Sequence, residues 1–197
     1  MKAKTLIRSV IAFSGFLFFA SAIAIPADLP PKSVVYYFGE PQMTNLLSGE
    51  TTSQKVLLQR VTDPAMGYIL EDGYAEDLGS TQCRHVPVYI VLAKNGAVTL
   101  TDVIDGSAKP SFQGTGQVMG DAWSWNYLKF SMTLSSNGMR IEDSNFLFPD
   151  QTLVARKQFF HAESATPFML YDGSYFKIDK DQYEKLFLQM GCKTTTP

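Results

Sequence analysis

The stretch Val86–Ile104, VPVYIVLAKNGAVTLTDVI, predicts the main feature of the fold. Two apolar, β-branched segments, Val86–Ala93 and Val98–Ile104, flank the dipeptide Asn95-Gly96. Asn-Gly readily supplies the two positive φ angles of a type I′ turn. The stretch therefore predicts an antiparallel hairpin.

The turn also predicts a register. With Asn95-Gly96 as a two-residue loop, Val91 lies opposite Leu100 and shares its face of the hairpin. The segment before the turn is apolar on both faces, as expected of a strand in the middle of a sheet.

A second Asn-Gly, at Asn137-Gly138, predicts a second hairpin between Trp123–Leu134 and Met139–Phe148. Pairing Leu134 with Ile141 then places polar residues opposite apolar ones further along the strands. One extra residue near Asp143-Ser144 would correct this by bringing Phe146 and Phe148 onto the face of Leu128 and Phe130. We therefore predict a β-bulge there.

The remaining chain reads mostly as strands, with turns at Asp72-Gly73 and Asp172-Gly173; Gln42–Leu47 is too short to assign. The other predicted strands are Ser33–Phe38, Lys55–Val61, Gly67–Leu70, Gln151–Ala162 and Ser174–Ile178.

One helix is predicted, at the C-terminal end. Asp179 is a suitable N-cap, Gln182 completes a capping box, and Gly191 suits the position after the last turn. An apolar stripe at helical spacing should dock on the sheet; its residues are Tyr183, Leu186, Phe187 and Met190. Strands followed by one helix predict a mainly β fold: an antiparallel β-barrel or sandwich-like single domain with one C-terminal helix.

The first residues have the pattern of a secretory signal peptide. A basic start precedes the apolar run Val10–Phe19, and Ala22-Ile23-Ala24 offers small residues for signal peptidase. We expect residues 1–24 to be removed, residues 25–192 to form the β-rich domain, and residues 193–197 to be a flexible tail. The pattern suits bacterial export, to the periplasm or the outside medium.

Charge argues against two classes of partner. Removal of the signal leaves fourteen basic against nineteen acidic residues, a formal charge of about −5. Since no Lys/Arg cluster is present, binding of nucleic acid or an anionic membrane is not expected. No apolar run in the mature chain has the length of a transmembrane helix.

The two cysteines, Cys83 and Cys192, are predicted to form a disulfide, because export carries them into an oxidising compartment. Two free buried thiols and an intermolecular bridge are the alternatives.

No catalytic or metal-binding motif accompanies either histidine, His85 or His161, so we assign no catalytic residue, no metal ligand and no cofactor. A hydrolase using one of them ranks third among the functions considered. Gly114-Thr115-Gly116 lacks the following helix of a phosphate loop and is interpreted as a strand kink or bulge. The segment Glu71–Asp77 lacks EF-hand spacing and is interpreted as a solvated acidic turn.

The candidate binding residues are aromatic: Trp123, Trp125 and Tyr127 alternate onto one face of a predicted strand, with Phe146 and Phe148 on its neighbour. The opposite face of that strand is also apolar. Both faces cannot belong to one core, so the aromatic face is either core in a two-layer packing or a surface that binds a ligand or partner.

The segment Gly116–Trp123, GQVMGDAW, leads into a long meander and a C-terminal helix held by a disulfide. In this respect Phe112–Cys192 resembles the lipocalin or calycin barrels, whose Gly-x-Trp motif marks a strand at the closed end of the barrel. The resemblance concerns architecture and implies carriage of a small hydrophobic ligand. The leading hypothesis is therefore an exported, non-enzymatic module that binds an apolar or amphipathic small molecule. The alternative is a secreted or periplasmic interaction factor, associated with the envelope or virulence, that uses the aromatic face against another envelope protein.

Overall fold

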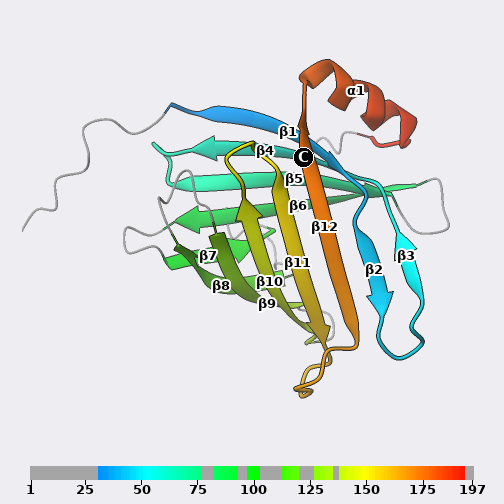
Figure 1. Ribbon diagram of the computed structural model, residues 1–197. Coiled ribbons are helices and arrows are strands. Elements are labelled where there is room, and N and C mark those ends of the chain that lie inside the picture. Colours follow the sequence, from blue (N-terminus) through cyan, green and yellow to red (C-terminus); the bar gives the residue numbers. More distant parts are fainter. Residues whose placement is uncertain are drawn as a thin grey trace, which may run out of the picture.

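The structure is a computed structural model that describes residues 31–76, 82–92, 97–102, 112–119, 127–134 and 138–193. The described residues form a 12-stranded antiparallel sheet and a helix at the C-terminal end (Figure 1). The fold is mainly β, as the sequence predicts, and the sheet curls into a partial barrel. Its strands are β1 (Ser33–Gly39), β2 (Gln42–Asn45), β3 (Thr51–Ser53), β4 (Val56–Asp63), β5 (Tyr68–Glu76), β6 (Cys83–Leu92), β7 (Ala97–Thr101), β8 (Phe112–Met119), β9 (Tyr127–Leu134), β10 (Arg140–Leu147), β11 (Leu153–Phe160) and β12 (Met169–Ile178).

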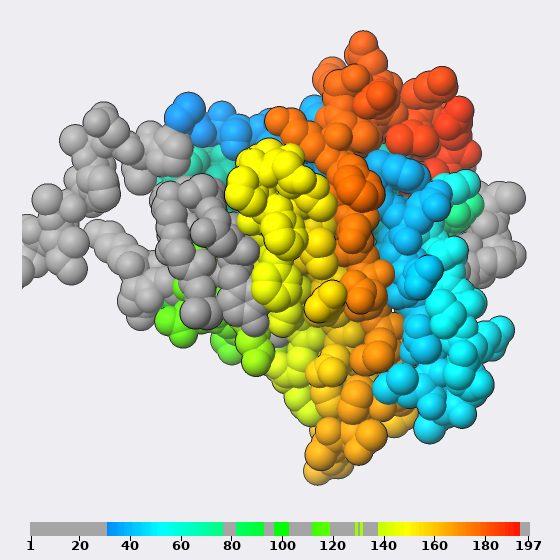
Figure 2. All heavy atoms as spheres, in the orientation of Figure 1, coloured from blue at the N-terminus to red at the C-terminus, as the bar shows by residue number. Residues whose placement is uncertain are grey.

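The strands from β4 to β12 pair in sequence order, and β1 links the two ends of this run. β1 pairs with β4 along one edge and with the second half of β12, Tyr175–Ile178, along the other. The first half of β12 pairs with β2, so β2 and β3 extend the sheet beside β12 (Figures 1 and 2). The pairings thus run around a ring and give the sheet a concave inner face.

The first predicted hairpin is present as β6 and β7, and β6 is central because it also pairs with β5. Its predicted register is wrong by one residue. Ile90, not Val91, lies opposite Leu100. A one-residue shift exchanges the two faces of a strand, so Ile90 is buried whereas Val91 is 44% exposed. The predicted turn residues, Asn95 and Gly96, lie outside the described residues.

The second hairpin, β9 with β10, has no bulge: the pairing is continuous from Arg140 to Phe146. Ile141 lies opposite Met132 rather than Leu134, and Asp143 lies opposite Phe130. The bulge was predicted in order to bring Phe146 and Phe148 onto the face of Leu128 and Phe130, which would have moved Asp143 away from an apolar partner. In the structure Asp143 is 1% exposed and is stabilised in the interior by a lysine.

Both predicted Asp-Gly turns are wrong, since Gly73 lies within β5 and Gly173 within β12. Both glycines lie where a neighbouring atom leaves little room for a Cβ. A Cβ on Gly73 would lie 3.0 Å from the Val86 carbonyl oxygen, and one on Gly173 would lie 3.0 Å from Pro41 Cβ. The predicted acidic turn at Glu71–Asp77 is likewise strand as far as Glu76.

Two further short stretches are strands that the sequence did not reveal. Gln42–Asn45 forms β2, and Gly114-Thr115-Gly116 lies in β8, which pairs regularly with β7 and β9 instead of kinking or bulging.

Helix α1 (Lys180–Gln189) confirms the predicted caps. Asp179 and Gln182 form the capping box, and Gly191 adopts a φ of 67° beyond the helix end. Tyr183 and Met190 are buried in an outer cluster with Leu57 and Tyr74, so the apolar stripe packs against the convex face of the sheet. The disulfide is confirmed: Cys83 and Cys192 are bonded with a Cα–Cα distance of 4.8 Å. It fastens the end of α1 to the start of β6.

Candidate ligand-binding cavity

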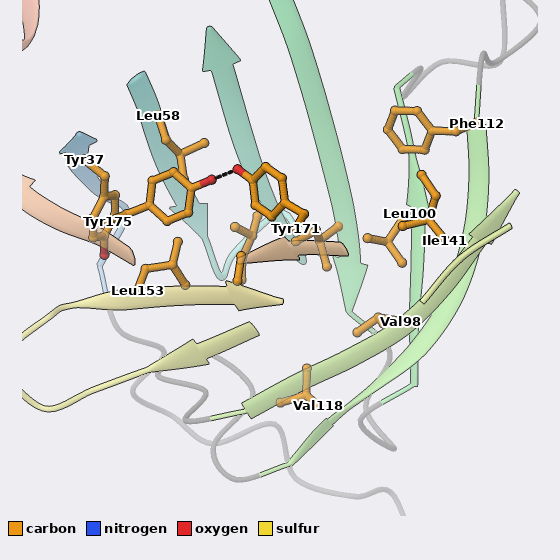
Figure 3. Packing of buried hydrophobic residues seen from close by; sticks show 13 residues of the cluster. Tyr37, Leu58, Val98, Leu100, Phe112, Val118, Ile141, Leu153, Tyr171 and Tyr175 are labelled. Carbon is orange, nitrogen blue, oxygen red and sulfur yellow. Dashed lines mark hydrogen bonds between the residues drawn. The ribbon is translucent and has the colours of Figure 1, made fainter. Parts of the chain in front are cut away.

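The interior of the curled sheet contains a cavity of about 420 Å³. Because side chains alternate between the two faces of a strand, every second residue points inward. Figure 3 shows inward side chains such as Leu58, Leu153 and Ile141 projecting from different parts of the sheet. The apolar lining also includes Met43, Val56, Val86, Val88, Phe112, Met139, Phe159 and Met169.

The cavity exists because residue size changes along neighbouring strands. On β5 the inward positions run from Ile69, which is fully buried, to the smaller Gly73 and Ala75. On β6 they run from Ile90 to Val86. Large side chains thus fill the interior at the Ile69–Ile90 level, and smaller ones leave space further along the same strands.

One wall of the cavity carries a buried ion pair. Lys157 on β11 lies directly opposite Asp143 on β10, and its Nζ is 2.8 Å from Asp143 Oδ2. Asn145 Nδ2 donates to the other oxygen, Asp143 Oδ1, at 3.0 Å. Burial alone would lower the pKa of Lys157, but attraction to Asp143 outweighs it and holds the pKa above its ordinary value. Lys157 is therefore a cation at neutral pH.

A second charged pair lies on strands β4 and β5. Arg60 and Glu71 are directly paired across these strands, and Arg60 is 3% exposed. Arg60 also forms a hydrogen bond with the hydroxyl of Tyr37. Burial raises the pKa of Glu71, against the opposing attraction of Arg60 and then of Lys157. Glu71 lines the cavity and interacts with charges from both walls.

Two tyrosines of β12 also belong to the polar part of the lining. The hydroxyls of Tyr171 and Tyr175 are hydrogen-bonded to each other (Figure 3). Burial raises the pKa of both groups. The cavity thus combines an extensive apolar surface with a few fixed polar groups, the composition usual for small-molecule sites.

The predicted aromatic residues occupy other places. Trp123 and Trp125 lie outside the described residues. Tyr127 is the first residue of β9, where its backbone pairs with Phe146 and Met119. Phe146 alternates with the inward Asn145 and so belongs to the outer face, and Phe148 follows β10 with 48% of its surface exposed. Neither phenylalanine lines the cavity, and the role of all five in binding stays a prediction.

Sequence reasoning did not identify the polar lining residues Glu71, Asn145 and Lys157, or the buried partners Arg60 and Asp143 behind them. The sequence did contain a signal for Lys157 and Arg60, in the alternation of residues along their strands. Lys157 occupies the same parity as Leu153, Ala155 and Phe159 on β11. Arg60 likewise follows Val56 and Leu58 at every second position. A charged residue in an otherwise apolar alternating series is a candidate buried group.

The histidines lie away from this cavity. His85 Nε2 contacts Asp72 Oδ1, and its ring stacks on Tyr74 at 4.7 Å. His161 is exposed, and its ring stacks on Phe168 at 4.3 Å. Within the described ranges no cluster of metal-ligating side chains occurs. In that same part of the chain, no helix combines the length and apolarity of a membrane span.

Comparisons with known proteins leave the family open. No protein-family model and no curated protein matches the sequence. Among solved structures, the chain has a distant similarity to the dehydratase domain of RzxB from Pseudomonas fluorescens, with 7% sequence identity over 73% of this chain and 75% of that chain. The TM-score is 0.15, so this likeness carries no argument about fold or function.

Proposed function

We propose that this protein is an exported module that binds an apolar or amphipathic small molecule within the curled sheet. The cavity of about 420 Å³ carries the proposal. Its volume lies in the range of about 300 to 1,000 Å³ found for small-molecule sites. A curled antiparallel sheet around a cavity supports the proposal, and the lipocalin-like resemblance of the sequence implies the same kind of carriage.

The composition of the lining favours binding over catalysis. Three methionines, Met43, Met139 and Met169, line the cavity. Their flexible thioether side chains adapt to irregular apolar shapes. Neither His85 nor His161 is among the lining residues. The disulfide between Cys83 and Cys192 is compatible with an oxidising compartment outside the cytoplasm.

The proposal is tested by filling the cavity. Ala155 faces inward and is 4% exposed, whereas its neighbour Val154 belongs to the outer face of the same strand. Ala155→Phe adds an aromatic ring to the cavity, and Val154→Phe is the matched control on the opposite face. We expect the first variant to weaken uptake of the neutral dye N-phenyl-naphthylamine at least about tenfold, because the ring occupies the ligand volume.

The measurement is the rise in dye fluorescence during titration, with circular dichroism to verify that both variants fold. Equal dye binding by the two variants would contradict the proposal. Absence of dye binding in the parent protein would favour the alternative, an interaction factor that uses the aromatic face.

A further inference from the structure

The buried charged groups beside the cavity balance in number. The interior holds two cations, Arg60 and Lys157, and two acidic groups, Glu71 and Asp143. Each cation lies opposite an acid on the neighbouring strand. The further titratable lining groups are the tyrosines and Arg84, whose side chain is exposed. A ligand that brings a net charge into the buried part of the cavity, away from the exposed Arg84, would therefore lack a counter-charge there.

Most interior polar groups use hydrogen bonds within the protein. Tyr171 and Tyr175 bond to each other, Arg60 bonds to Tyr37, and Asn145 donates to Asp143. Of the two interior cations, Lys157 is the one that lines the cavity. Its ammonium has three donors and is ion-paired with Asp143, and the side chain is 27% exposed. Its other contact is the Tyr171 ring, 5.5 Å from Nζ.

From this geometry, we propose that Lys157 Nζ anchors a neutral oxygen acceptor, a hydroxyl or ester carbonyl, on an otherwise apolar ligand. This inference rests on the proposed function. The apolar part of the ligand would lie against the aliphatic and methionine lining, and its oxygen would accept a hydrogen bond from Lys157. A hydrogen bond from a charged donor is stronger than one between neutral groups.

The position of Asp143 argues against an anionic head group. A ligand carboxylate beside Lys157 would also lie near Asp143, which is 2.8 Å from the same nitrogen, and near Glu71 on the facing wall. Like charges in a poorly solvated space repel strongly. A cationic head group would meet Lys157 and Arg60 with the same result. A neutral head group leaves both ion pairs intact.

The test compares four ligands with the same carbon chain: dodecanol, methyl dodecanoate, dodecanoate and dodecylamine. Each displaces bound N-phenyl-naphthylamine from the full exported protein at about pH 7, below the micelle-forming concentration. We expect the alcohol and the ester to displace the dye at concentrations about tenfold lower than the two charged ligands.

A double variant isolates the lysine. Lys157→Met with Asp143→Asn removes the donor without leaving a buried charge unpaired. We expect dodecanol to lose about tenfold in affinity while the dye, which has no oxygen, binds as before. The matched control is Arg156→Met, which removes a cation from the outer face of the same strand.

The outcomes distinguish failure of this inference from failure of the proposed function. Tighter binding of dodecanoate or dodecylamine, or equal binding of all four ligands, would overturn this inference. The proposed function would still stand if Ala155→Phe blocked the dye. Unchanged dodecanol binding by the folded double variant would remove Lys157 from the site. If the double variant did not fold, the ranking of the four ligands on the parent protein would still decide between neutral and charged heads. Failure of the parent protein to bind either dye or ligand would overturn both proposals.

Discussion

Lys157 Nζ lies 2.8 Å from Asp143 Oδ2 in the interior of the sheet, where the two residues face each other across β10 and β11. The carboxylate side chain has no exposed surface, and the lysine side chain is 27% exposed. Two charges withdrawn from water depend on each other, because each compensates the desolvation of its partner.

The first expected outcome concerns this pair. Lys157→Met alone should destabilise the protein by about 3 to 5 kcal/mol, because it leaves Asp143 buried without its cation. Adding Asp143→Asn should recover much of that loss. Urea unfolding of the parent, single and double variants measures both changes. Equal destabilisation by the single and double variants would show that the charge of Asp143 is not the cause.

The neighbouring residue provides the comparison. Arg156 Nε lies 3.6 Å from Asp172 Oδ1 on the outer face, where both side chains are more than half exposed. Exposed pairs contribute about 0 to 1 kcal/mol. Arg156→Met should therefore change the free energy of unfolding by less than about 1 kcal/mol in the same urea assay. A loss as large as that of Lys157→Met would contradict the contrast between the inner and outer faces.

The second expected outcome concerns the disulfide. Cys83 and Cys192 are 109 residues apart, and a bridge closing so long a loop stabilises the fold by about 4 to 5 kcal/mol in the chain-entropy model. Replacing both cysteines with serine should lower the melting temperature and speed hydrogen exchange in α1. Dye binding should persist below that temperature, since α1 packs on the convex face. Loss of dye binding by the folded variant would show that the helix supports the cavity.

The third expected outcome concerns alkaline pH. Burial raises the pKa of Tyr171 and Tyr175 above the ordinary value of 10.0. A raised pKa in the folded state stabilises the fold below the unfolded pKa, and this contribution is lost as pH rises through the folded pKa. Stability should thus fall over the pH range from about 9 upward, because the unfolded tyrosines ionise near pH 10 while the buried ones stay protonated. Tyr175→Phe, measured by urea unfolding across this range, should reduce the slope; an unchanged slope would exclude Tyr175 as its source.

The fourth expected outcome concerns processing. Ala22 and Ala24 are small residues at the two positions that signal peptidase reads, so the exported chain should begin at Ile25. N-terminal sequencing of protein from its host decides this. An intact chain beginning at Met1 in the membrane fraction would identify the apolar run as an anchor and contradict export as a soluble module.

The sequence predicted the parts of the fold that depend on local or compositional signals. Asp179, Gln182 and Gly191 specify the helix ends through contacts within one or two turns. The Asn-Gly dipeptides located both hairpins. The pairing of Cys83 with Cys192 followed from the expected oxidising compartment and from the presence of two cysteines. The strand registers, and which face of each strand points inward, were harder to predict from the sequence. The same Gly that permits a turn also permits a close approach between strands, as at Gly173 beside Pro41.

The sequence by itself determined a mainly β chain with a C-terminal helix and one disulfide, because alternation, capping and cysteine number act locally or through composition. Only the tertiary structure decided which face of each strand is inside and that Lys157, Asp143, Arg60 and Glu71 gather around one cavity. The physical reason is that side chains along a strand alternate between its two faces. A shift of one residue exchanges the faces of a strand, and the cost of placing a charge inside depends on whether a partner strand presents the opposite charge. That partner is set by pairing across the sheet.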